Sequence, residues 1–202
     1  MKKSLLLGWL LLLACSLQAQ NQAQAKKILD KTAAIVGRKG GASADFSIQG
    51  SSYEPVSGTI AVKGNKFYAK TPKGATWFNG KTQWTYLSKS GEVNVANPSD
   101  AQQAQMNPYK FIVLYKNGYD LGVKEAGGDY RIHMKATTKG RSIQEMYITI
   151  NKSSYLPKEV RMLQKGKWTT ITIRNFKAKN LSDATFTFNA KDYPKAEIID
   201  LR

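Results

Sequence analysis

Short runs in which apolar and polar side chains alternate recur along most of this 202-residue chain, and they restrict its fold more than any other feature. One such run, WFNGKTQWTYL at residues 77–87, contains Asn79-Gly80, a residue pair preferred in two-residue hairpin turns. A turn of that length at Asn79-Gly80 pairs Trp77 with Thr82 across an antiparallel hairpin. One face of the hairpin then carries Trp77, Trp84 and Tyr86.

The same alternation predicts a mainly β protein with about ten or eleven strands, too many for a flat open sheet, which would curl or split in two. Turns at Gly64-Asn65 and Gly166-Lys167 join four of these strands, and Phe186 and Phe188 indicate the last one. The apolar face is expected to contain Phe46, Ile48, Ile60, Val62, Phe67, Trp77, Trp84, Tyr86, Ile132, Met134, Ile148, Ile150, Met162, Ile171 and Ile173. The alternation alone leaves open whether these side chains line a hollow or pack a solid sandwich core.

Only two or three short helices are available to cover this face. An apolar stripe from Ile28 to Val36, ended by Gly37, predicts the first helix. Asn107-Pro108 has the form of a helix start, and a second stripe follows it as far as Lys116. We expect these helices to form a lid over the apolar face with the side chains of Leu29, Ile35, Phe111, Ile112 and Tyr115.

The first residues have the pattern of an export signal. Met1-Lys2-Lys3 precedes a leucine-rich run at Leu5–Leu13, which is too short to cross a membrane. Leu17-Gln18-Ala19 is an acceptable cleavage site. We therefore expect a signal peptide at residues 1–19 and one exported domain at residues 20–202.

The chain contains a single cysteine, Cys15, which lies inside the signal region. Cleavage after Ala19 would remove it, and the exported protein would then have no disulfide and no thiol chemistry. The residues Leu12-Leu13-Ala14-Cys15 leave a second possibility, because they resemble the site at which lipoproteins are lipidated on cysteine. In that case Cys15 would be the mature N-terminus.

The chain is strongly basic, with 31 Lys and Arg residues against 14 Asp and Glu. Between Pro55 and Gly91 there are lysines and no acid, and Lys63, Lys66 and Lys70 fall on the polar side of the Gly64-Asn65 hairpin. These three lysines are candidates for contact with an acidic partner or with anionic lipid head groups. The alternative is a solvated outer face of the sheet.

Residues with catalytic or metal-binding chemistry are scarce. The one histidine, His133, falls on the polar side of its strand, and no hydrolase, metalloprotease or P-loop motif occurs. The sequence therefore predicts no catalytic residue, no metal site and no cofactor. It also contains no nucleic-acid recognition motif.

Several motifs, in this order, resemble those of the periplasmic lipoprotein carriers of the LolA family, most closely those of the Bacteroidetes type. Counterparts in that family exist for the strand residues Ala44–Gln49 and Gly58–Lys63, the hairpin residues Asn79–Tyr86, Asn107-Pro108, and Phe186-Thr187-Phe188. The resemblance implies an unclosed antiparallel β-barrel of about eleven strands with a helical lid over an apolar cavity. The cavity would receive the acyl chains of lipoproteins, and the tryptophans would be part of its lining.

The resemblance also implies partners. A monomeric carrier in the periplasm would collect acylated lipoproteins from an inner-membrane ABC transporter and deliver them to an outer-membrane acceptor. The alternative on the same fold is a membrane-anchored receptor or envelope sensor that is lipidated at Cys15. A lipid hydrolase is disfavoured, because no catalytic triad motif is present.

One departure from the family pattern concerns the lid. Many members carry an Arg-Pro pair whose arginine holds the lid closed, whereas this chain has Gly64 and Asn65 at those positions. That latch is therefore not expected here, and Lys63 and Lys66 are candidates to replace it.

Overall fold

The computed structural model describes the backbone of residues 2–51, 53–99, 102–103 and 113–202, with side chains described from Ala19 onward except that of Tyr53. The helices with both ends in these residues are α1 (Lys2–Val36) and the short 3-10 helices η1 (Leu114–Lys116), η2 (Asp183–Phe186) and η3 (Ala190–Asp192). The strands are β1 (Ala42–Gly50), β2 (Tyr53–Lys63), β3 (Lys66–Thr71), β4 (Gly74–Phe78), β5 (Gln83–Leu87), β6 (Glu92–Ala96), β7 (Tyr119–Ala126), β8 (Asp129–Ala136), β9 (Glu145–Asn151), β10 (Pro157–Gln164), β11 (Lys167–Ala178) and β12 (Glu197–Asp200).

All twelve strands belong to one sheet, in the order β12-β6-β5-β4-β3-β2-β1-β11-β10-β9-β8-β7. Antiparallel pairing of β1 with β11 joins the two halves of the chain. β12 and β7 lie at opposite edges, so the sheet does not close into a barrel. The predicted unclosed, mainly antiparallel sheet is confirmed. The parallel strand β12, which pairs with β6, was not predicted, because its four residues carry no extended alternation.

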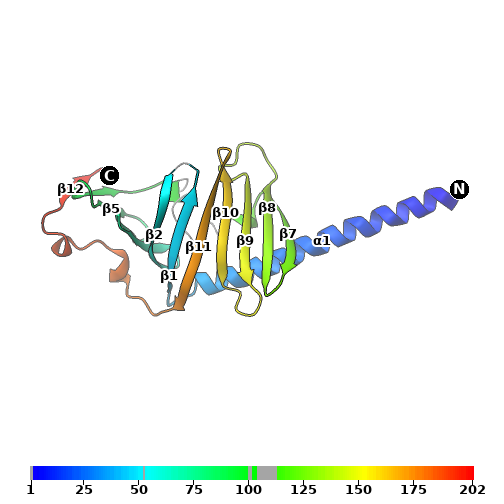
Figure 1. Cartoon of the computed structure of the whole chain (residues 1–202), viewed down its shortest axis with the longest axis horizontal. Helices are drawn as coiled ribbons and strands as arrows, with labels where there is room; N and C mark the ends of the chain where they lie inside the picture. The colour runs from blue at the N-terminus through cyan, green and yellow to red at the C-terminus, as the bar shows by residue number, and fades with distance from the viewer. Residues whose placement is uncertain (1, 52, 100–101, 104–112) are drawn as a thin grey trace.

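Helix α1 covers part of one face of the sheet, which we call the inner face, and the opposite face is called the outer face. Figure 1 shows the first half of α1 projecting beyond the β7 edge, while its second half lies across the sheet. The helix buries a single stripe of residues, which consists of Ala25, Ile28, Leu29, Thr32, Ala33 and Val36. The predicted helical stripe and its end at Gly37 are confirmed, since the Gly37 N–H donates to the Ala33 carbonyl at 2.8 Å.

The start of the packed half of α1 also protects the edge of the sheet. The side-chain amide of Asn21 donates to the Val123 carbonyl at 3.0 Å, and its oxygen accepts from the Val123 N–H at 2.7 Å. One side chain thus takes the hydrogen-bonding place of a neighbouring strand residue on β7. Such protection is expected of an edge strand, because unpaired backbone groups invite association with another chain.

The hairpin between β4 and β5 has a different register from the predicted one. Trp77 pairs with Trp84 and not with Thr82, because the turn contains four residues and not two. The Asn79 side chain accepts hydrogen bonds from the N–H groups of Lys81 and Thr82, at 3.0 and 2.9 Å, and this stabilises the longer turn. The shift is two residues, so Trp77, Trp84 and Tyr86 still share one face, as predicted.

The C-terminal segment, residues 179–196, packs on the outer face of β3–β5 before the chain ends in β12. Phe186 of η2 is fully buried there, while the rings of Phe188 and Tyr193 contact Trp77 with centroid distances of 5.4 and 5.5 Å. In Figure 1 this segment leaves β11 and runs along the sheet to the far edge. The prediction of a strand at Phe186 and Phe188 is wrong, because these aromatic residues cover the sheet rather than extend it.

Candidate functional site

The inner face carries most of the residues that the sequence assigns to one apolar face. Phe46 pairs with Ile173 and Ile48 with Ile171, so the central strands β1 and β11 present the same side to α1. The pairs Val160–Ile148 and Ile148–Ile132 carry this face onto β10, β9 and β8. The predicted residues found on it are Phe46, Ile48, Ile60, Val62, Phe67, Ile132, Met134, Ile148, Ile150, Met162, Ile171 and Ile173.

The part of the inner face beneath α1 is a closed apolar core. Leu29 is fully buried and belongs to one cluster with Tyr115, Val123 and the inner-face residues of β8–β10. Its large, almost fully buried sheet residues are Ile132, Met134, Met146, Ile148 and Ile150. Here α1 and the sheet exclude water from each other.

The part of the inner face on the central strands is less covered. Phe46, Ile48, Ile60, Ile171 and Ile173 are half-buried, on β1, β2 and β11. Ile171 and Ile173 pack against the core beneath α1, so this half-buried surface continues that core without a break. An apolar surface therefore extends from beneath a helix onto strands where it is partly accessible.

Polar contacts on both sides of α1 hold the helix against the sheet. The buried Thr32 hydroxyl donates to the Tyr155 carbonyl at 3.0 Å, and the Lys31 ammonium lies 3.1 Å from the Tyr155 hydroxyl. On the other side, the Tyr115 hydroxyl of η1 donates to Asp30. Three consecutive residues of α1 thus fasten it to two different loops, and sequence reasoning did not foresee these contacts. A polar residue within an apolar stripe, Thr32, was the available signal.

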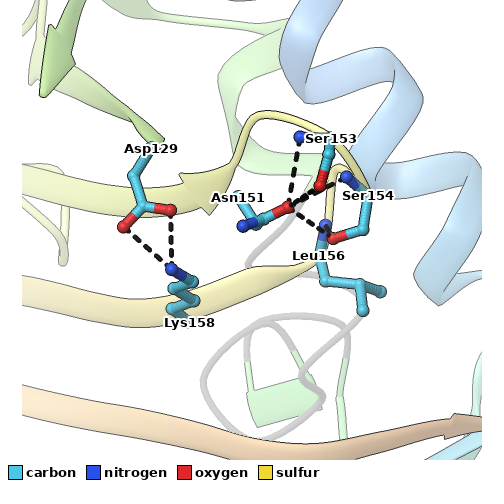
Figure 2. A network of polar contacts seen from close by, with 6 residues as sticks. All are labelled: Asp129, Asn151, Ser153, Ser154, Leu156 and Lys158. Atoms are coloured by element: carbon cyan, nitrogen blue, oxygen red, sulfur yellow. Dashed lines mark hydrogen bonds and ion pairs between the residues drawn. The ribbon is translucent and has the colours of Figure 1, made fainter. Parts of the chain in front are cut away.

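The loop that carries Tyr155 is itself rigidified by one asparagine. Figure 2 shows the Asn151 side-chain oxygen accepting from the N–H and hydroxyl groups of Ser153 and Ser154, at distances of 2.7 to 3.1 Å. In the same view Lys158 of β10 reaches across β9 to both carboxylate oxygens of Asp129 on β8, at 2.7 and 3.0 Å. The β9–β10 loop is therefore a fixed point to which α1 is attached.

The outer face carries Trp77, Trp84 and Tyr86. The prediction that they share the apolar face with Val62 and Phe67 is therefore wrong. Phe67 pairs with Phe78, whereas Tyr68 pairs with Trp77. The cause is the two-residue turn at Pro72-Lys73, which pairs odd-numbered residues of β3 with even-numbered residues of β4. Phe78, only 1% exposed, takes the inner position that the sequence interpretation gave to Trp77.

The outer face beside these aromatic residues is closed by the C-terminal segment. The ring of Tyr86 lies 4.7 Å from that of Tyr193, and Trp77 is 7% exposed. Burial is also the main cause that raises the pKa of Tyr193. The aromatic residues of the β4–β5 hairpin and of the C-terminal segment therefore form a small core on the outer face. This core attaches the end of the chain to the sheet.

Lys63, Lys66 and Lys70 lie on the outer face, as predicted, but two of them are engaged within the protein. Lys63 and Lys66 each approach the Asp183 carboxylate at 2.9 Å, and Lys63 also donates to the Leu181 carbonyl at 2.8 Å. They fasten the C-terminal segment, and among the described residues no contact joins them to α1. Lys70 is exposed, and its contact with an acidic partner or anionic head groups stays a prediction.

The two lysines hold the pKa of Asp183 at about 2, below its ordinary value of 3.8, with the Lys66 hydrogen bond as the largest cause. Because the folded pKa is depressed, this contact stabilises the fold above about pH 4 and is lost as the pH falls toward 2. We expect Asp183→Asn to lower stability at pH 6 and to flatten its dependence on pH between 4 and 2, measured by urea unfolding. Lys63→Gln/Lys66→Gln should have a similar effect, and combining both changes should add little. Additive losses would contradict the ion-pair explanation.

The remaining lid residues are only partly described. Ile35 is half-buried and lies beside the stripe, whose inward positions are taken by Ala33 and Val36. Tyr115 is 4% exposed and packs in the core beneath α1. Phe111 and Ile112 lie outside the described residues, as does most of the predicted helix from Pro108 to Lys116.

His133 lies on the outer face, as the sequence predicted. Its Nε2 is 2.7 Å from Glu145, and its ring stacks on Tyr147 with a centroid distance of 4.6 Å. Hydrogen bonds from Tyr147 first, and then from His133, lower the pKa of Glu145.

Within the described part of the chain no group of three or more histidine, cysteine or acidic residues could hold a metal ion. No helix among the described residues has the length and apolarity needed to cross a membrane.

The family model for the outer membrane lipoprotein carrier protein LolA matches residues 15–167. This chain belongs to the LolA family. The matched residues include the packed half of α1, β1–β10 and the start of β11, which together hold most of the inner face. The C-terminal segment and β12 lie outside the match. No curated protein sequence matches the chain.

One solved structure shows the same kind of fold, and two others align less closely. A conserved protein from Thermus thermophilus aligns with a TM-score of 0.58 and 17% sequence identity, over 88% of this LolA family member and 99% of that chain. An outer membrane lipoprotein-sorting protein domain from Vibrio parahaemolyticus aligns at 0.47 and 12% identity, over 87% and 100%. A LolA superfamily protein from Nitrosomonas europaea aligns at 0.44 and 11% identity, over 81% and 97%.

Proposed function

We propose that this protein is a periplasmic carrier that binds the acyl chains of lipoproteins on its inner face and transfers them between the two membranes. The observation that carries the proposal is the continuous apolar surface that runs from beneath α1 onto the half-buried residues of β1, β2 and β11. Membership of the LolA family supports the same function. The proposed donor is an inner-membrane ABC transporter, and the proposed recipient is an outer-membrane acceptor.

The physical demands on a carrier fit an apolar surface without catalytic groups. Each methylene removed from water contributes about 0.8 kcal/mol, so a chain of roughly 15 methylenes cannot leave a membrane for water at a useful rate. The carrier must shield that chain and still release it. Dispersion contacts with isoleucine and phenylalanine side chains shield the acyl chain. Because they involve no directional bonds, they also allow its release.

We propose α1 as the movable cover of this surface. Its attachment by Thr32, Lys31 and Asp30 consists of hydrogen bonds at the margins of the helix, two of them to tyrosine hydroxyls. Individual hydrogen bonds of this kind contribute about 0.5–1.5 kcal/mol each. The apolar contacts of the buried α1 stripe can be replaced by those of bound acyl chains, so the sheet need not unfold when α1 moves. In this proposal the hydrogen bonds of Thr32, Lys31 and Asp30 take the place of the family's arginine latch.

We propose that export removes residues 1–19. Cleavage after Ala19 would leave the packed stripe of α1, which begins at Ala25, in place. The half of the helix that projects beyond the sheet would be removed (Figure 1). A mature N-terminus at Gln20 supports a diffusible carrier, whereas a triacylated Cys15 would support the anchored receptor. The mass of the N-terminal peptide from the native protein distinguishes the two.

The carrier proposal is tested with a dipalmitoyl-cysteinyl peptide that carries a fluorophore at its C-terminus. We expect the purified protein to bind this peptide and to leave the same peptide without acyl groups unbound, measured by fluorescence anisotropy. The complex should also release the peptide to phospholipid vesicles. Equal affinity for both peptides would contradict the proposal.

A further inference from the structure

A groove lies between α1 and the β7 edge of the sheet, beside the core beneath α1. Its volume is about 360 Å³, and it is lined by Ala19, Gln22, Ala23 and Lys26 of α1 and by Tyr115, Lys116, Gly118, Tyr119 and Leu121. This size is near the lower limit of small-molecule sites, which have volumes of roughly 300–1,000 Å³. The groove is large enough for a head group with a few methylenes.

The floor of the groove is apolar because its two tyrosine hydroxyls are used by the protein. The Tyr119 hydroxyl donates to the Ile143 carbonyl at 2.9 Å, and the Tyr115 hydroxyl donates to Asp30. Their rings remain as walls, together with Leu121 and Ala23. Tyr115 and Tyr119 also belong to the buried core beneath α1, so the floor leads directly to the inner face.

The charged residues that line the groove are all cationic. Lys26 and Lys116 are exposed and stand on different elements, α1 and η1. Arg141 adds a third positive charge, since its guanidinium lies 5.0 Å from the centre of the Tyr119 ring. The carboxylate of Asp30, one turn of α1 from Lys26, accepts a hydrogen bond from the Tyr115 hydroxyl. An apolar floor with lysines at its margin is suited to an anionic amphiphile.

The geometry points to this groove as a binding site for the anionic head of an acyl lipid, either the carboxylate of a fatty acid or the phosphate of a phospholipid. The head group lies between Lys26 and Lys116, and the acyl chain follows Tyr115, Tyr119 and Leu121 toward the inner face. The inference rests on the proposed function only in taking that face as the place of the acyl chain. Removal of residues 1–19 would delete Ala19 and leave the other lining residues in place.

The test measures binding of laurate, dodecyl phosphate, neutral monolaurin and inorganic phosphate to the purified protein by isothermal titration calorimetry. Lys26→Gln/Lys116→Gln should weaken both anionic lipids about 25-fold, since a lysine near an anionic head group contributes about 1 kcal/mol. Monolaurin binding should change less than twofold. The matched control is Lys27→Gln/Lys124→Gln, which removes two exposed charges from α1 and β7 that do not line the groove. The preferred anionic lipid identifies the head group.

A second pair of variants tests the position without changing charge. Ala23→Phe fills the groove and should abolish binding of both anionic lipids, whereas Ala34→Phe, at another exposed position of α1, should not. Equal losses in the two lysine double variants would overturn the inference, as would inorganic phosphate binding as tightly as dodecyl phosphate. Monolaurin binding equal to that of laurate would overturn it and leave the carrier function intact. Failure of every acyl probe to bind would instead contradict the carrier function.

Discussion

Replacing Ile48 with aspartate is expected to weaken binding of the dipalmitoyl-cysteinyl peptide by about 100-fold or more, because a carboxylate under an acyl chain loses its water without gaining a partner. Ile48 lies on the inner face of the central strand β1, is half-buried, and belongs to neither buried core cluster. The loss should therefore come from the binding surface and not from unfolding. Fluorescence anisotropy measures the affinity, and urea unfolding of the free protein measures the stability.

The next residue of the same strand supplies the matched control. Gln49 is exposed and points to the outer face, so Gln49→Asp adds the same charge to the same strand on the opposite side. It should bind the acylated peptide like the unmodified protein. Similar losses in the two variants, or none in Ile48→Asp, would show that the inner face of β1 does not receive the acyl chains.

Truncating Phe186 to alanine is expected to lower the free energy of unfolding by about 3–5 kcal/mol, the usual cost of removing a buried phenylalanine side chain. Phe186 is fully buried at the end of η2, where the C-terminal segment covers the outer face. The variant should also expose part of the aromatic cluster around Trp77. Urea unfolding, followed by far-ultraviolet circular dichroism, measures the change.

Leu201→Ala is the control for Phe186→Ala, since Leu201 lies at the same end of the chain but is 64% exposed. It should change stability by less than about 0.5 kcal/mol. A loss below about 1 kcal/mol for Phe186→Ala would mean that the C-terminal segment is not part of the cooperative unit. That result would contradict its assignment to the small core on the outer face.

The strands and the inner face could largely be read from the sequence because alternation is a local property. Ile148 and Ile150, or Ile171 and Ile173, are two residues apart on one strand and must point to the same side. The two-residue turn at Gly64-Asn65 gives the predicted register. The second turn lies at Lys165-Gly166, one residue before the predicted Gly166-Lys167, and this shifts the pairing by two residues without changing the faces. At the second turn both residues have positive φ, 49° and 73°, which is the geometry expected at Asn79-Gly80 but found here.

Turn length could not be read with the same certainty, and it decides the face of every residue that follows. The turn at Asn79 is two residues longer than predicted, which leaves the faces unchanged. At Pro72-Lys73 a two-residue turn pairs the inner residue Phe67 with Phe78 and the outer residue Tyr68 with Trp77. This alone places Trp77, and with it Trp84 and Tyr86, on the outer face. The alternation within one strand separates its residues into two sets, but it does not tell which set faces inward.

The sequence by itself determined the mainly antiparallel sheet, the apolar stripe of α1 with its end at Gly37, and most of the residues that share the inner face. Only the tertiary structure decided that the hairpin tryptophans face the C-terminal segment, and that Lys63 and Lys66 are held by Asp183. It alone decided that Thr32 and Asp30 fasten α1 to Tyr155 and Tyr115. The physical reason is distance along the chain. Periodicity and turn chemistry act between near neighbours, whereas these contacts join residues 85 or more positions apart, which only folding brings together.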